Sequence, residues 1–76
     1  MTQEANHARY DQLLGQPIDA LDGLTPRAAA QKPDLRPKLI EWLKGQIHFL
    51  EVVNRRDGLQ LNIDWVLDEL GAPELK

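Results

Sequence analysis

Residues 35–56 read LRPKLIEWLKGQIHFLEVVNRR and form the longest helical pattern in the chain. Apolar residues recur there at spacings of three and four, which places them on one face of an α-helix. This stripe consists of Leu39, Ile40, Leu43, Ile47, Leu50 and Val53. Three further apolar residues widen the stripe to one side, namely Trp42, Phe49 and Val52. The pattern predicts one long amphipathic helix that supplies much of the core.

The ends and the middle of this helix carry residues with distinct local effects. Asp34 is placed to cap the start, and Pro37 lies in the first turn, where a missing N–H is tolerated. Asp57 and Gly58 follow the last turn and predict its end. Gly45 in the helix interior costs about 1 kcal/mol relative to alanine. We therefore expect a close helix crossing or a bend at Gly45.

Three shorter helices are predicted, over residues 3–14, 26–31 and 63–70. Thr25 can cap the second of these, and Asn62 can cap the last. The loop over residues 16–24 carries apolar residues at a spacing of three, so we expect it to pack over the core. No strand pattern is present, and residues 72–76 are expected to fray. The fold class is therefore all-α, a small compact bundle of about four helices with the third longest, in one domain over residues 1–76.

Composition limits how such a domain can be stabilised. The chain has 76 residues, no cysteine and a net charge of −3, and 42% of its residues are hydrophobic. Because one core in so short a chain seldom supplies more than about 3–5 kcal/mol, the chain depends on helix packing, self-association or a partner. No apolar run approaches the ~18 residues of a membrane span, and no secretory signal is visible, so the cytoplasm is the expected location.

The residue types needed for catalysis are missing or scattered. Cysteine and serine are absent, which removes the usual nucleophiles. His7 and His48 fall on different predicted helices, without the paired spacing of a zinc site. Asp64 and Asp68 lie one turn apart, but a solvated helix face explains them, because nothing nearby supplies a nucleophile or further oxygen ligands. We expect no enzyme, no metal and no cofactor.

Nucleic-acid binding is the alternative to a protein-binding role. Four basic residues lie close together in the sequence: Arg27, Lys32, Arg36 and Lys38. A basic patch could be built from them, as phosphate binding requires. Asp34 and Glu41 are interleaved with these cations, and no basic recognition helix stands out. The mildly acidic balance also argues against nucleic acid as the main partner.

The large aromatic and cationic residues are the candidates for contacting a protein partner. Tryptophan and arginine are enriched where partners bind most strongly. In a chain this small, however, a tryptophan is also an expected core residue, and both alternatives stay open for the two present. The candidate partner-binding residues are Trp42, Phe49, Arg55, Arg56 and Trp65.

Residues 14–29 read LGQPIDALDGLTPRAA and resemble a known motif. The segment is similar to L-x-x-P-x-x-A-L-x-G-x-T-P-x-E-A in the toxin-binding domain of Xre/MbcA/ParS-type bacterial antitoxins. Ala28 stands where that motif has glutamate. The resemblance implies a small helical domain that pairs with a toxin and often dimerises. Taken together, the sequence predicts a non-catalytic, antitoxin-like protein-interaction module whose partner is itself or a larger protein such as a toxin.

Overall fold

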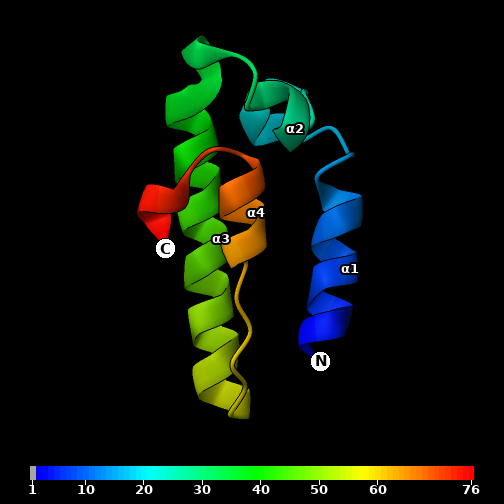
Figure 1. Ribbon diagram of the computed structural model, residues 1–76, viewed down its shortest axis with the longest axis vertical. Helices are drawn as coiled ribbons and strands as arrows, with labels where there is room; N and C mark the ends of the chain where they lie inside the picture. Colours follow the sequence, from blue (N-terminus) through cyan, green and yellow to red (C-terminus); the bar gives the residue numbers. More distant parts are fainter. Residues whose placement is uncertain (1) are drawn as a thin grey trace.

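A computed structural model describes residues 2–76, and within that range the chain is helical with no strand. The α-helices are α1 (Gln3–Leu13), α2 (Pro26–Ala29), α3 (Arg36–Asp57) and α4 (Asp64–Glu69). Three 3₁₀ turns lie between or after them: η1 (Asp19–Leu21), η2 (Pro33–Leu35) and η3 (Pro73–Leu75). Helices α1 and α3 run in opposite directions, with α4 between them (Figure 1). The predicted small all-α bundle with the third helix longest is confirmed.

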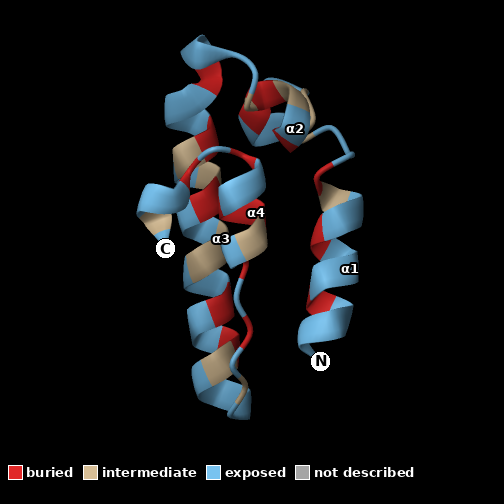
Figure 2. Ribbon diagram, viewed as in Figure 1, coloured by how far each residue is buried: buried red, intermediate tan, exposed pale blue. Residues whose placement is uncertain are grey.

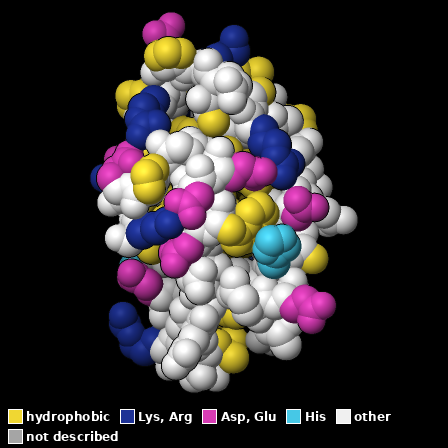
Figure 3. Space-filling view, in the orientation of Figure 1, with side chains coloured by type: hydrophobic (Ala, Val, Ile, Leu, Met, Phe, Trp, Pro, Cys, Tyr) yellow, Lys and Arg dark blue, Asp and Glu magenta, His cyan; other side chains and the backbone are white. Residues whose placement is uncertain are grey.

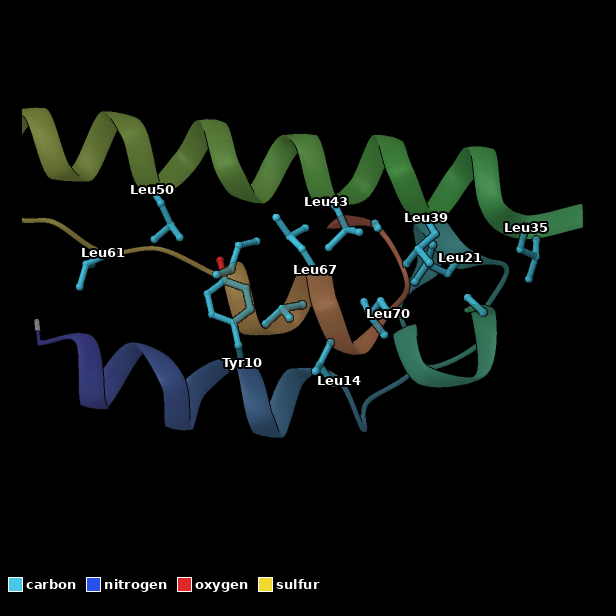
Figure 4. Close-up of a cluster of buried hydrophobic side chains, with 14 of the residues drawn as sticks. Tyr10, Leu14, Leu21, Leu35, Leu39, Leu43, Leu50, Leu61, Leu67 and Leu70 are labelled. Carbon is cyan, nitrogen blue, oxygen red and sulfur yellow. The ribbon is translucent and has the colours of Figure 1, made fainter. Parts of the chain in front are cut away.

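The core lies between α3, α1 and α4. Helix α3 contributes Leu39, Leu43, Leu50 and Val53, all buried, along one face (Figure 2). Tyr10 of α1 and Leu14 at its C-terminal end point toward them from the opposite side, and Leu67 of α4 lies between (Figure 4). Helix α4 is only six residues long. Such short helices are held by packing rather than by their own propensity.

The segment between α1 and α2 folds as its turn residues predict. Leu21 is fully buried, which confirms that the predicted loop packs over the core. Asp22 and Gly23 both have positive φ, 59° and 79°, and reverse the chain so that Ile18 and Leu24 pair in an isolated bridge. The Thr25 hydroxyl then accepts a hydrogen bond of 3.0 Å from the N–H of Ala28 and caps α2. The motif of residues 14–29 therefore forms a compact corner against the start of α3.

An extended segment, residues 59–63, connects α3 to α4, and side-chain amides replace a neighbouring strand. On one side, Asn54 of α3 both donates to the carbonyl of Leu61 and accepts from its N–H, each at 2.9 Å. On the other side, Gln3 of α1 makes the same two bonds to the backbone of Asn62, each at 3.1 Å. The fully buried Asn6 adds a second donor to the Asn62 carbonyl. These bonds satisfy backbone groups that a helix would otherwise pair internally.

Four predictions about local structure are wrong. Asn62 does not cap α4, because Ile63 stands at the N-cap position without a side-chain cap, and the Asn62 Oδ1 accepts only from the N–H of Asp64 at 3.2 Å. Asp34 does not cap α3, because residues 33–35 form η2 and the helix starts after Leu35 without a side-chain cap. Residues 72–76 do not fray, because Ala72 is fully buried and the Lys76 ammonium reaches the Asp68 carboxylate at 2.7 Å. No helix crosses closely at Gly45, where a Cβ atom would meet nothing within 4 Å, and α3 continues unbroken through it.

Candidate interaction surface

A row of residues on α3 lies beside the buried stripe, on a neighbouring face of the helix. Trp42, Gly45, Phe49 and Val52 follow one another at spacings of three, four and three, so they share one face of the helix. Phe49 and Val52 are 43% and 44% exposed, and they are the exposed large hydrophobics among residues 2–76. Gly45 is exposed and Trp42 is half-buried. These four residues form the α3 seam.

A shallow hollow marks the end of the seam nearest the start of α3. Trp42 lines it together with Ala20, Pro37, Lys38 and Glu41. Trp42 also packs partly against the core, so one part of its side chain is buried and another part lies at the surface. On the rim, the Lys38 ammonium lies 2.7 Å from the Asp22 carboxylate and ties α3 to the corner before α2. The hollow is open to solvent and mostly apolar, as a place for a partner side chain should be.

Helix α1 borders the seam through a cation and a buried phenol. The Arg9 guanidinium lies 5.5 Å from the ring centroid of Phe49 and 5.7 Å from that of Tyr10, within cation–π range. Tyr10 is fully buried and its hydroxyl donates to Gln46 of α3 at 2.8 Å. Burial raises the pKa of the Tyr10 phenol above its ordinary 10.0, and the Arg9 charge opposes that rise. Arg9 thus lies over the Phe49 ring, and Phe49 remains partly exposed to water.

Trp65 lies apart from the seam. Its ring stacks on His7 of α1, with centroids 4.1 Å apart and planes inclined by 23°. His7 and Arg9 are separated by about 200° around α1, so Trp65 and Phe49 contact opposite sides of that helix. Trp65 packs partly against the core, and its buried Nε1 has no hydrogen-bond partner within residues 2–76. The structure therefore does not bring Trp65 together with Trp42 and Phe49.

The two predicted arginines differ in where they lie. Arg56 follows Val52 by four positions and extends the line of the seam. Its guanidinium bonds both oxygens of the neighbouring Asp57 at 3.2 Å, and that pairing raises the pKa of Arg56. Arg55 is exposed, lies on the flank of the seam and has no ion pair within residues 2–76. Of these two arginines, only Arg55 therefore carries a charge without an ion pair within residues 2–76.

The basic residues of the nucleic-acid alternative are mostly paired with carboxylates. Arg27 lies 3.4 Å from Asp11 and 3.3 Å from Glu69, which ties α2 to α1 and α4. Arg36 pairs with Glu74 and Lys38 with Asp22, whereas Lys32 has no ion pair in the part of the chain described. On the face drawn in Figure 3, Lys and Arg side chains alternate with Asp and Glu. These cations stabilise contacts between elements and do not form a continuous basic face.

A second cavity, of about 200 Å³, lies between α3, residues 61–64 and the C-terminal residues. Glu51, Asp64 and Lys76 are the charged residues that line it, and all three are exposed. His48 does not line it. Within residues 2–76 no group of three or more His, Asp or Glu side chains is arranged to hold a metal ion, and no helix is long and apolar enough to cross a membrane.

No family model, curated protein or solved structure matches the chain. The resemblance of residues 14–29 to the antitoxin domain therefore stays a prediction. The class defined by the fold is a small all-α bundle.

The sequence prediction included two members of the seam, Trp42 and Phe49, and omitted Gly45 and Val52. Their common spacing with Trp42 and Phe49 was the available signal, because spacings of three and four that repeat beside the core stripe mark a second apolar face. The border residue Arg9 gave no such signal. It lies 40 positions from Phe49, and only the packing of α1 on α3 brings the two together.

Proposed function

We propose that this chain is a non-catalytic protein-interaction module that binds its partner through the α3 seam. The observation that carries the proposal is the exposure of Phe49 and Val52 on a helix whose other face already fills the core. Spacings of three and four are those by which one helix packs against another. The natural partner surface is therefore an apolar helix face.

The resemblance of residues 14–29 supports a more specific form of this proposal. An antitoxin-like chain would present its surface to a larger protein, a toxin, or to a second copy of itself. In this chain the resembling residues build the corner that carries Asp22 and abuts the hollow at Trp42. An antitoxin-like role would thus place the corner and the seam on one continuous binding face.

Nucleic-acid binding receives less support from the same contacts. A protein that binds nucleic acid needs cations that are free to pair with phosphates, because this pairing releases counterions. Three of the four candidate cations are already paired with carboxylates. A labelled duplex and a labelled single strand at low salt would test this alternative. A shift that weakens steeply with added salt would revive it.

The experiment for the main proposal compares substitutions on and off the seam. Phe49→Glu and Val52→Glu put a charge into the apolar row, and Glu51→Gln alters an exposed neighbour on another face of α3. Immobilised chains would be exposed to soluble extract and the retained proteins quantified, with circular dichroism to confirm folding.

We expect the wild type and Glu51→Gln to retain the same partner protein. When copies of the chain itself are added, both should retain those copies as well. Phe49→Glu and Val52→Glu should lose it while keeping their helical signal. Equal retention by all four chains would contradict the proposal.

A further inference from the structure

We infer that the occupant of the α3 seam is a second copy of this chain, whose α3 helix lies antiparallel to the first. This inference rests on the proposed function and adds to it the identity of the partner and the register of the contact. The spacing of the seam, the charges that flank it and the glycine at its centre support this pairing.

The spacing of the seam matches the heptad positions of a helix pair. Trp42, Phe49 and Arg56 recur every seven residues, and Gly45 and Val52 recur between them at the second core position. In an antiparallel pair whose two-fold axis lies level with residue 47, each residue at the first core position faces a residue at the second core position of the other copy. Phe49 then faces the second copy's Gly45, and Trp42 faces the second copy's Val52. The two apolar layers, Phe49 with Gly45 and Trp42 with Val52, therefore each pair a large side chain with a smaller one.

A parallel pair would place like against like. Phe49 would meet Phe49, and Gly45 would leave a gap against Gly45. Since helix interfaces need the packing density of a protein interior, the antiparallel register fits the side-chain volumes better.

The flanking charges complement one another in the same register. Glu41 and Arg55 lie on the same side of the seam, one heptad position before Trp42 and Arg56. The two-fold axis places Glu41 opposite the second copy's Arg55, and by symmetry this pair forms twice. Within one chain these charges are nearly unused, because Glu41 is 79% exposed with Lys44 at 3.9 Å, and Arg55 has no ion pair within residues 2–76. Opposite charges at such flanking positions set the partner and the orientation of paired helices.

The outer ends of the seam are also balanced. Lys38 would lie opposite the second copy's Arg56. Each of these cations already holds a carboxylate of its own chain, Asp22 or Asp57. Each end of the paired helices thus holds two cations and two anions, so the charges at the ends are balanced and do not oppose association.

Gly45 provides an independent reason for a second helix at this place. Glycine is a poorer helix former than alanine, and a Cβ there would meet no atom within 4 Å beyond its chain neighbours and the adjacent backbone of its own helix. Its small size therefore serves no contact inside the monomer. Beside Phe49 of a second copy it leaves room for the ring.

The charges are tested by reversal and exchange. Glu41→Arg and Arg55→Glu each convert both attractive pairs of the dimer into repulsive ones, and the double variant exchanges the charges and restores attraction. Glu51→Arg makes the same charge change as Glu41→Arg away from the seam. Sedimentation equilibrium of the full chains gives the dimer Kd. We expect each single reversal to raise Kd by about tenfold, the double variant to return near the wild type, and Glu51→Arg to leave Kd unchanged.

The register is tested by disulfide formation, which the absence of native cysteine makes unambiguous. Gly45→Cys and Phe49→Cys chains are mixed under mild oxidation and the products weighed by intact-mass spectrometry. We expect the mixed disulfide to dominate, because these two positions face each other only in the antiparallel pair. Dominant Gly45→Cys homodimers would indicate a parallel pair and overturn the inferred register.

A wild-type chain that stays monomeric at about 1 mM would overturn the inference, since a weaker association would contribute under about 4 kcal/mol. In that case the proposed function would still hold if a different protein bound the wild type but not Phe49→Glu. A wild-type chain that stays monomeric and also binds no different protein in this way would contradict both the inferred dimer and the proposed function. Charge reversals that leave Kd unchanged in a dimer would place the contact on another face.

Discussion

Gly45 and Gly58 show how differently a single glycine can act within one helix. Gly45 lies in the interior of α3 with open space around it, whereas Gly58 ends the helix with a φ of 68°. A side chain is compatible with the first backbone conformation and strained in the second. The same substitution should therefore have opposite effects at the two positions.

We predict that Gly45→Ala raises the free energy of unfolding by about 1 kcal/mol, because alanine is the better helix former. Gly58→Ala, the matched control, should lower it by a similar amount. Urea unfolding at concentrations where the chain is monomeric measures both. Destabilisation by Gly45→Ala would show that the space around residue 45 is occupied.

Tyr10 links stability to alkaline pH. Its pKa is raised in the folded chain, first by burial, so the phenol holds its proton more tightly when folded than when unfolded. The resulting stability is fully present below the ordinary value of 10.0 and is lost as pH rises through the folded pKa. We predict a fall in unfolding free energy above about pH 10 that is absent from Tyr10→Phe.

The substitution also removes the hydrogen bond to Gln46 and should cost about 1 kcal/mol at neutral pH. Thermal unfolding from pH 7 to 11 would measure both effects. An identical alkaline decline in the two proteins would assign the pH dependence to another group.

At the level of elements, the extended segment 59–63 depends on side chains rather than on secondary structure. Asn54 alone satisfies both backbone groups of Leu61. We predict that Asn54→Ala lowers the free energy of unfolding by about 1–3 kcal/mol, because part-buried backbone groups lose their partner. Gln60→Ala, an exposed neighbour on the same segment, should change it little. Equal effects from both substitutions would show that the Asn54 bonds are replaced by water.

Helices and turns could be predicted from the sequence wherever the signal was local. The spacing of Leu39, Leu43, Leu50 and Val53 predicted α3, and Thr25 predicted the start of α2. Contacts between distant residues could not be predicted. Gln3 bonds Asn62 across 59 positions, a pairing without any periodic pattern. The fold of residues 72–76 was missed for the same reason, because Asp68 anchors Lys76 only after α4 has formed.

The candidate site was predicted in part. The residue type pointed to Trp42 and Trp65 alike. Only the packing of α1 separates them, because His7 stacks on Trp65, whereas Trp42 lies on α3 in the same row as Phe49. The sequence also could not show that Arg55 has no ion pair within residues 2–76, because pairing depends on which carboxylates the fold brings near. Composition gives the residue types of an interface, and the fold decides which of them stay exposed.

For the molecule as a whole, the apolar side chains of α3 divide between a buried core and an exposed row. Leu43 is fully buried and Phe49 is 43% exposed on the same helix. We predict that Leu43→Ala lowers the free energy of unfolding by about 2–5 kcal/mol, enough to unfold much of a chain this small. Phe49→Ala should cost well under half as much. Chemical denaturation compares them, and similar losses would place Phe49 in the core.

The central proposal is that another protein surface covers the apolar row on α3, and that a second copy of the chain provides this surface. Sedimentation equilibrium of the wild type over a range of concentrations tests this most directly, with Phe49→Glu beside it. We predict a molar mass that rises from one chain toward two for the wild type and stays at one chain for Phe49→Glu, with the same helical signal in both. A mass of one chain throughout, or dimers that survive Phe49→Glu, would contradict the account.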